Sequence, residues 1–275
     1  MSSKLPTLLF VPGSWLSTDI YRDTAVQLPE YRSVVIDQPT NKMRPASVDM
    51  HEDIEHTRTA IENELQSGND VVIIAHSAGG LIGCLAAQSL SKAQRLAAGY
   101  STGVVGYIGV ASILPHLGKT IMDMNAEFWV AKQNALAAEL GPPTRTFDQI
   151  AAAYKFNEDY TVDVLEPEYL FYNDLPAEEA KPWIAKHETQ SGTMYNLKTL
   201  ENPITDQVPS YYIFAMRDNA IPGCIQDEYA LQTVAGNREN IFKLDSDHIP
   251  HLSHPKELED LLRKALERII GSSLN

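Results

Sequence analysis

The ten residues VVIIAHSAGG at positions 71–80 decide how the rest of this chain is interpreted. The first five form a continuous apolar run, which is typical of a parallel strand covered on both faces. Residues 78–97 are rich in Ala, Leu and Gly and predict a buried helix. Ser77 therefore stands at the apex of a sharp turn, with the small residues Ala75 and Gly79 two positions before and after it. A serine in this setting presents its hydroxyl at a helix N-terminus above the sheet, so Ser77 is a candidate nucleophile.

Strand and helix patterns alternate on both sides of this turn. Helical spacing of apolar residues marks 48–66 and 256–270, and further strand patterns occur at 7–11, 33–36, 104–111, 211–215 and 241–244. Strands that alternate with helices form a mainly parallel sheet with right-handed crossovers. We therefore predict an α/β fold with a sheet of about six strands.

The alternation is interrupted by one long segment. From about 115 to 209 the pattern is helical and contains aromatic residues but no strong strand. This segment lies between two predicted strands, so it should cover the carboxyl edge of the sheet. The predicted division is a core built from residues 1–113 and 207–275, and a helical cap formed by residues 114–206.

Composition restricts the class of protein. The chain has 275 residues, of which 44% are hydrophobic and 21% charged, as in a globular protein with a large core. The formal net charge of −14 argues against binding to nucleic acid or to an anionic membrane, because both repel an acidic surface. The start of the chain lacks the pattern of a secretory signal, and no apolar run approaches the length of a membrane-spanning helix, so we expect a cytoplasmic protein. Two cysteines do not make a disulfide framework, and no spacing typical of a metal site or a phosphate-binding loop occurs; no cofactor is expected.

A serine hydroxyl is a weak nucleophile and needs a base and a group that orients the base. Asp218 follows the predicted strand 211–215, and His248 follows the predicted strand 241–244. Both therefore lie at carboxyl ends of strands, where ligands collect in α/β folds. We predict that Ser77, His248 and Asp218 act together.

Other acids and bases are less well placed. Asp206 precedes its strand, and Asp227 falls in the presumed next helix. Asp245 and Asp247 stand too close to the histidine in the chain to reach round to its far ring nitrogen. His251 is a weaker candidate for the base, although it could line a pocket.

The loop after the first strand, VPGSW at 11–15, is the candidate oxyanion loop. Gly13 lets the backbone turn toward the site, and the N–H groups of Ser14 and of Ala78, the residue after the nucleophile, are the expected donors. A plain tight turn is the alternative interpretation of the loop.

Five segments together resemble the α/β-hydrolase superfamily: VPGSW (11–15), AHSAGG (75–80), FYNDLP (171–176), RDNAIP (217–222) and DHIPHLSHP (247–255). Within it, the chain resembles small bacterial and fungal hydrolases near the plant methylesterase and hydroxynitrile lyase group. The resemblance implies a triad of Ser77, Asp218 and His248, an oxyanion hole from Ser14 and Ala78, a helical cap, and a sheet without the first two strands of the superfamily. The chain departs from the family pattern at Pro12, where many members have His, and at Ala75, which replaces Gly.

The expected activity is hydrolysis of a carboxylic ester or lactone of a small, largely hydrophobic substrate of secondary metabolism, through an acyl-enzyme. Four residues are expected to line the substrate pocket: Trp15, Phe128, Trp129 and His251. The same triad could instead serve a lyase, a C–C bond hydrolase or an acyltransferase, and a ligand-binding protein on this fold is a further alternative. A hydroxynitrile lyase would need a lysine near the histidine, and neither Lys243 nor Lys256 is well placed. An apolar cap could also support a homodimer.

Overall fold

The computed structural model describes residues 4–41, 49–132, 145–199 and 202–273. Its centre is a six-stranded parallel sheet with strand order β2-β1-β3-β4-β8-β9. The strands are β1 (Thr7–Val11), β2 (Ser33–Val35), β3 (Val71–His76), β4 (Val104–Val110), β8 (Ser210–Ala215) and β9 (Ile241–Leu244). The mainly parallel α/β sheet expected from the sequence is confirmed.

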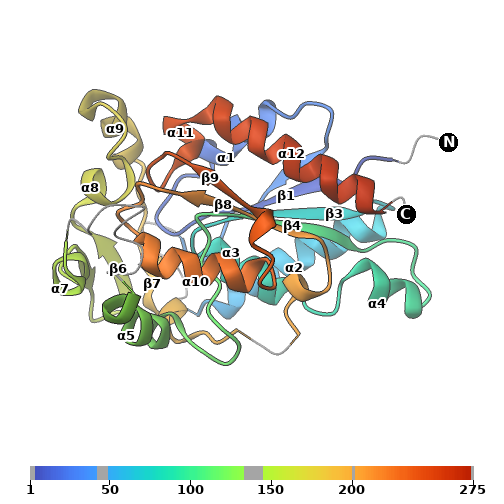
Figure 1. The fold of residues 1–275 in the computed structure, drawn as a ribbon, viewed down its shortest axis with the longest axis horizontal. Coiled ribbons are helices and arrows are strands. Elements are labelled where there is room, and N and C mark those ends of the chain that lie inside the picture. Colours follow the sequence, from blue (N-terminus) through green and yellow to red (C-terminus); the bar gives the residue numbers. More distant parts are fainter. Residues whose placement is uncertain (1–3, 42–48, 133–144, 200–201, 274–275) are drawn as a thin grey trace.

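Helices cover both faces of this sheet (Figure 1). Their bounds are α1 (Asp19–Val26), α2 (His51–Gln66), α3 (Gly79–Ala86), α4 (Lys92–Ala97), α10 (Gly223–Thr233), α11 (Pro250–Ser253) and α12 (Pro255–Ser273), with a short 3-10 helix η3 at Arg238–Asn240. Helices α2, α3 and α10 pack on one face, whereas α1, α11 and α12 lie on the other. Because both faces are covered, every residue of β1, β3, β4 and β8 is buried.

The helix predicted over 78–97 is two helices in the structure. Helix α3 ends at Ala86, and Ser89 takes a positive φ of 64° before the chain turns into α4. The Ser91 side chain accepts a hydrogen bond from the backbone N–H of Gln94 and so caps the new helix. Only α3 is buried, since no residue of α4 is. The prediction of one long buried helix is therefore wrong, because a local serine cap ends the pattern.

The inserted segment between β4 and β8 gathers at the end of the sheet where the strands finish (Figure 1). Its described elements are α5 (Ile121–Lys132), α7 (Phe147–Ala151), β5 (Tyr154–Phe156), β6 (Thr161–Val164), α8 (Pro167–Phe171), α9 (Ala177–Ile184), β7 (Gln190–Ser191), η1 (Gly192–Asn196) and η2 (Ile204–Asp206). Strands β5, β6 and β7 form a small antiparallel sheet that the helical pattern did not predict. Strands of two to four residues are too short to produce a readable alternation. The boundaries 114 and 206 stay a prediction.

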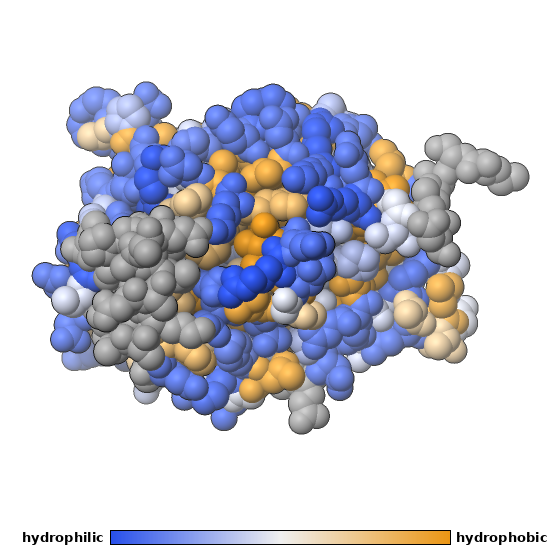
Figure 2. Space-filling view, viewed as in Figure 1, coloured by the Kyte–Doolittle hydropathy of each residue, from blue (hydrophilic) through white to orange (hydrophobic). Residues whose placement is uncertain are grey.

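In the face seen in Figure 2, hydrophilic residues surround hydrophobic patches near the centre. Among the described residues, no helix combines the length and the apolar character needed to cross a membrane.

Candidate active site

Ser77 occupies the tight turn between β3 and α3. Its φ is +51°, in the left-handed region that non-glycine residues seldom adopt, so the backbone here is strained. The Ser77 carbonyl accepts hydrogen bonds from the backbone N–H groups of Gly80 (2.9 Å) and Ile113 (2.8 Å), which hold the turn. A Cβ at Gly79 would stand 2.3 Å from the Val11 carbonyl oxygen, so only glycine lets the helix start this close to β1.

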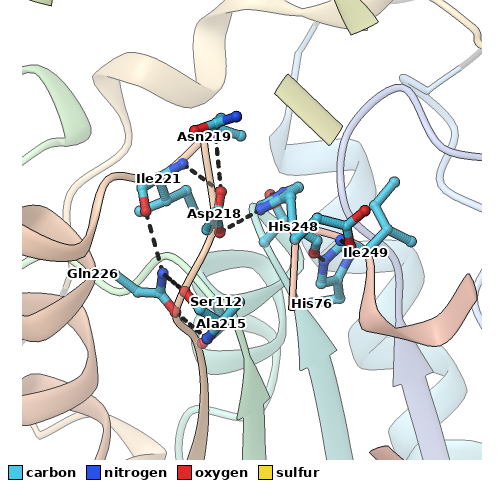
Figure 3. Close-up of polar contacts among 12 residues, drawn as sticks. His76, Ser112, Ala215, Asp218, Asn219, Ile221, Gln226, His248 and Ile249 are labelled. Carbon is cyan, nitrogen blue, oxygen red and sulfur yellow. Dashed lines mark hydrogen bonds and ion pairs between the residues drawn. The ribbon is translucent and has the colours of Figure 1, made fainter. Parts of the chain in front are cut away.

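Ser77, His248 and Asp218 each follow the end of a different strand, and their side chains are joined by hydrogen bonds in that order. The Ser77 Oγ lies 3.0 Å from His248 Nε2, and His248 Nδ1 lies 2.7 Å from Asp218 Oδ2. Figure 3 shows the contact between Asp218 and His248, with the strands of the sheet below these two residues. Because a carboxylate accepts, the proton belongs on Nδ1, and Nε2 is then free to accept the Ser77 hydroxyl proton. All three side chains are buried.

Hydrogen bonds from its own backbone and from the Gln226 side chain hold the loop that carries Asp218. Its Oδ1 accepts hydrogen bonds from the backbone N–H groups of Ala220 and Ile221, both at 2.8 Å. The fully buried Gln226 side chain bonds both the N–H and the carbonyl of Ala215 and also the carbonyl of Ile221 (Figure 3). Gln226 therefore ties the end of β8, the loop and α10 together. Gln226 was not predicted from the sequence, because a glutamine inside a helix carries no distinctive signal.

The two aspartates next to His248 in the chain have other contacts. Asp245 forms an exposed ion pair with Arg217 at 3.2 Å. Asp247 Oδ1 accepts hydrogen bonds from the Ile249 N–H (3.1 Å) and the Ser253 hydroxyl (2.7 Å), and so caps the turn that follows His248. Burial raises the pKa of the Asp247 carboxyl.

The loop after β1 is pinned at the residues on both sides of Ser14. The Gly13 N–H donates to the Tyr21 hydroxyl, and the Trp15 N–H donates to Asn41 Oδ1, each at 2.8 Å. Within the described part of the chain, the N–H groups of Ser14 and Ala78 donate to no protein acceptor. Two free backbone donors beside Ser77 are what an oxyanion hole requires.

A buried network joins this loop to His248. The Tyr21 hydroxyl is 2.7 Å from His76 Nδ1, and His76 Nε2 is 2.8 Å from the backbone carbonyl of His248. A carbonyl only accepts, so His76 carries its proton on Nε2 and accepts the Tyr21 hydroxyl proton at Nδ1. Burial lowers the pKa of His76 well below its ordinary value, so its ring stays neutral. Neither the contacts of His76 nor the role of Tyr21 was predicted from the sequence.

His251 lies behind this network. Its ring packs edge-on against Tyr21 and His76, with centroids 5.0 and 4.8 Å away, and neither ring nitrogen has a partner among the described residues. Burial lowers the pKa of His251 to about 3.

A cavity of about 860 Å³, including its open part, reaches Ser77 and His248. Its described lining is mostly apolar or aromatic: Trp15, Ile113, Ile121, Met122, Ile150, Ala151, Tyr154, Phe156, Phe171, Met194, Tyr195, Ala220, Ile221, Pro222, Ile225 and Tyr229, with Asn125 as a further polar residue. Trp15 lies in the lining as predicted and stacks on Phe171, which in turn stacks on the His248 ring.

The other predicted pocket residues are placed differently. Phe128 contacts the His116 ring, and His251 contacts the Tyr21 and His76 rings; neither residue is in the described lining. The Trp129 side chain lies outside the described part of the structure. No three His, Cys, Asp or Glu side chains among the described residues gather closely enough to hold a metal ion.

The parallel sheet with a serine, histidine and aspartate at its strand ends defines the class of α/β hydrolases. Residues 8–261 match the model of the alpha/beta hydrolase family, and the chain belongs to this family. It is 26% identical over 267 residues to an alpha/beta hydrolase of Aspergillus novofumigatus (strain IBT 16806), a match that covers 94% of this chain and 96% of that protein.

Two solved structures have a similar fold. One is a pyrethroid hydrolase from Sphingobium faniae JZ-2 (TM-score 0.66, 19% identity, 96% of this chain and 98% of that chain). The other is a methylesterase protein from Arabidopsis (TM-score 0.63, 15% identity, 96% of this chain and 99% of that chain). The family and its named relatives support hydrolase activity, and the resemblance to the α/β-hydrolase superfamily is confirmed.

Proposed function

We propose that this protein is a serine hydrolase that cleaves carboxylic esters or lactones of small, largely hydrophobic molecules. The observation that carries the proposal is the pair of hydrogen bonds that joins Ser77 Oγ to the His248 ring and this ring to Asp218. Ser77 and His248 also line a largely apolar cavity. Buried side chains that hydrogen-bond in this order form a nucleophile, a base and a group that orients the base.

Acylation uses the geometry directly. Ser77 Oγ bonds to the carbonyl carbon of the substrate, and its proton moves to His248 Nε2 across the 3.0 Å hydrogen bond. Asp218 stabilises the cationic imidazole through Nδ1–H. The N–H groups of Ser14 and Ala78 hydrogen-bond the oxyanion. The tetrahedral intermediate then expels the alcohol, which takes the proton from His248 and leaves an ester on Ser77.

Deacylation repeats the sequence with water. His248 accepts a proton from water as the water oxygen attacks the acyl carbon, and the same two N–H groups bind the new oxyanion. Collapse releases the acid and returns the proton to Ser77. The net reaction consumes one ester and one water and yields one acid and one alcohol. No cofactor takes part in this scheme.

The substrate class follows from the cavity lining. Apolar and aromatic side chains dominate it, so a hydrophobic acyl or alcohol group gains free energy on leaving water. A lactone meets the same requirement, because its alcohol stays attached to the acyl group. A small ester or lactone of secondary metabolism therefore remains the favoured substrate.

The proposal is tested by labelling with a fluorophosphonate and by screening aryl esters and lactones with the wild type and Ser77→Ala. We expect labelling at Ser77 and ester or lactone turnover that the substitution abolishes. Labelling elsewhere, or turnover that survives in Ser77→Ala, contradicts the serine mechanism.

The alternatives have separate readouts. An acyltransferase gives a new ester when an alcohol is added, a lyase releases a carbonyl compound from its adduct without consuming water, and a C–C hydrolase cleaves a β-diketone into an acid and a ketone. No lysine is present in the described cavity lining, so a lyase that needs one there gains no support. A ligand-binding protein would bind its ligand equally well as the wild type and as Ser77→Ala, without turnover.

A further inference from the structure

Three tyrosines line the largely apolar cavity. Tyr154 comes from β5, Tyr195 from η1 and Tyr229 from α10, so three separate elements bring them to the same space. Tyr229 is only 1% exposed, and the other two are partly buried. Polar groups that converge in an apolar pocket usually determine how a ligand is oriented.

None of the three hydroxyls has a hydrogen-bond partner within the described part of the protein. Other tyrosines of the core do: Tyr107 donates to the Gly80 carbonyl at 2.8 Å, and Tyr212 donates to the Ser112 carbonyl at 2.9 Å. These hydroxyl oxygens are not among the fully enclosed polar atoms that lack a partner, so they lie against open space. These three hydroxyls therefore remain available to a molecule in the cavity.

All three tyrosines line the same cavity. Burial raises the pKa of each phenol, and Tyr195 contributes a smaller electrostatic effect that also raises the pKa of Tyr154 and of Tyr229. With raised pKa values the phenols stay neutral near pH 7, so each can donate as well as accept a hydrogen bond.

The charge of the lining limits what the hydroxyls bind. No Lys, Arg, Asp or Glu occurs in the described lining. A charged group placed there would lose its hydration without an opposite charge in return. The chemistry therefore fits a neutral oxygen, such as a ketone, hydroxyl or ring oxygen.

We propose that Tyr154, Tyr195 and Tyr229 form a polar subsite that binds a neutral oxygen substituent of the substrate other than the carbonyl that reacts. The substrate class is then an oxygenated hydrophobic ester or lactone, not a plain hydrocarbon ester. This inference rests on the proposed function. The subsite would hold the substrate at a second point, in addition to the reacting carbonyl. Two points of contact fix the direction in which the substrate lies.

The test compares matched substrates. We would measure kcat/KM for p-nitrophenyl esters of medium-chain acids, plain or with one keto group at successive positions, together with esters that carry the keto group in the alcohol. The wild type should prefer the best-placed keto ester over its plain counterpart by roughly tenfold or more, as one or two hydrogen bonds to a buried group would give. Tyr195→Phe and Tyr229→Phe should each reduce this ratio by about five- to tenfold. Tyr212→Phe, whose hydroxyl is paired elsewhere, is the matched control and should keep the wild-type ratio.

A wild type with no preference for any keto ester overturns the subsite, and so do Tyr→Phe variants that retain the full ratio. A separate measurement covers failure of the proposed function itself. If no ester is turned over, binding of a medium-chain ketone and of the alkane of equal length to Ser77→Ala is compared by calorimetry. Tighter binding of the ketone that Tyr229→Phe weakens supports the subsite, whereas equal binding refutes it.

Discussion

Replacing Tyr21 with phenylalanine removes one hydroxyl that has two buried partners. The Gly13 N–H loses its acceptor, and His76 Nδ1 loses its donor, while the ring of residue 21 stays in place. Both partners lie beside the candidate machinery, because Gly13 precedes Ser14 and His76 holds the His248 carbonyl. We therefore expect the substitution to lower both the stability of the protein and kcat, which can be measured separately.

The magnitude follows from the two lost contacts. Leaving a buried donor or acceptor unpaired costs about 1–3 kcal/mol, so two such groups lower the free energy of unfolding by about 2–6 kcal/mol. For a protein of this size that corresponds to a fall in Tm of roughly 4–24 °C. Loss of one oxyanion donor slows other enzymes by about 10²–10³, and a loosened loop should give a smaller effect, about 10- to 100-fold in kcat.

The assay is the thermal unfolding midpoint together with kcat and KM on an active ester, recorded well below the Tm of the variant. We expect a lower kcat with little change in KM, because the loop acts on the transition state rather than on the bound substrate. Tyr212→Phe removes an equally buried hydroxyl that has one carbonyl partner, and it should keep kcat. A folded Tyr21→Phe enzyme with wild-type kcat would refute the role of Tyr21 in positioning the oxyanion loop.

Three further predictions concern the acid, the turn and acid stability. Asp218→Asn should lower kcat by about 10⁴, measured by steady-state kinetics, because the His248 tautomer is no longer held; a loss under tenfold contradicts this role. Gly79→Ala should unfold at least about 2 kcal/mol more easily in urea, since its Cβ would meet the Val11 carbonyl at 2.3 Å, and an unchanged midpoint would rule out this clash. Because the native pKa of His251 is about 3, below its ordinary value of 6.5, the unfolded chain binds a proton first and stability falls as pH drops from about 6 to 4. Measured by urea unfolding, the free energy of unfolding of His251→Leu should depend less steeply on pH than that of the wild type, by about 1.4 kcal/mol per pH unit. The same dependence on pH in both proteins would contradict this prediction.

The central strands could be predicted from the sequence because they are buried on both faces. The apolar runs at 7–11 and 71–75 coincide with β1 and β3. The end of a helix was harder to predict. The long helix predicted after Ser77 is broken near Ser89, which has a positive φ, and Ser91 caps the new helix.

Chain order and local turn chemistry determined the candidates Ser77, Asp218 and His248 from the sequence alone. A small-residue turn after a buried strand, followed by an acid and a base at later strand ends, is a local pattern that needs no tertiary information. Only the tertiary structure decided the distances of 3.0 and 2.7 Å that join them, since these depend on how three strands align in one sheet. It also showed the contacts of Tyr21 and Gln226 and brought the three tyrosines to one cavity. Their roles come from contacts between segments far apart in the chain, and such contacts leave no periodic signal in the sequence.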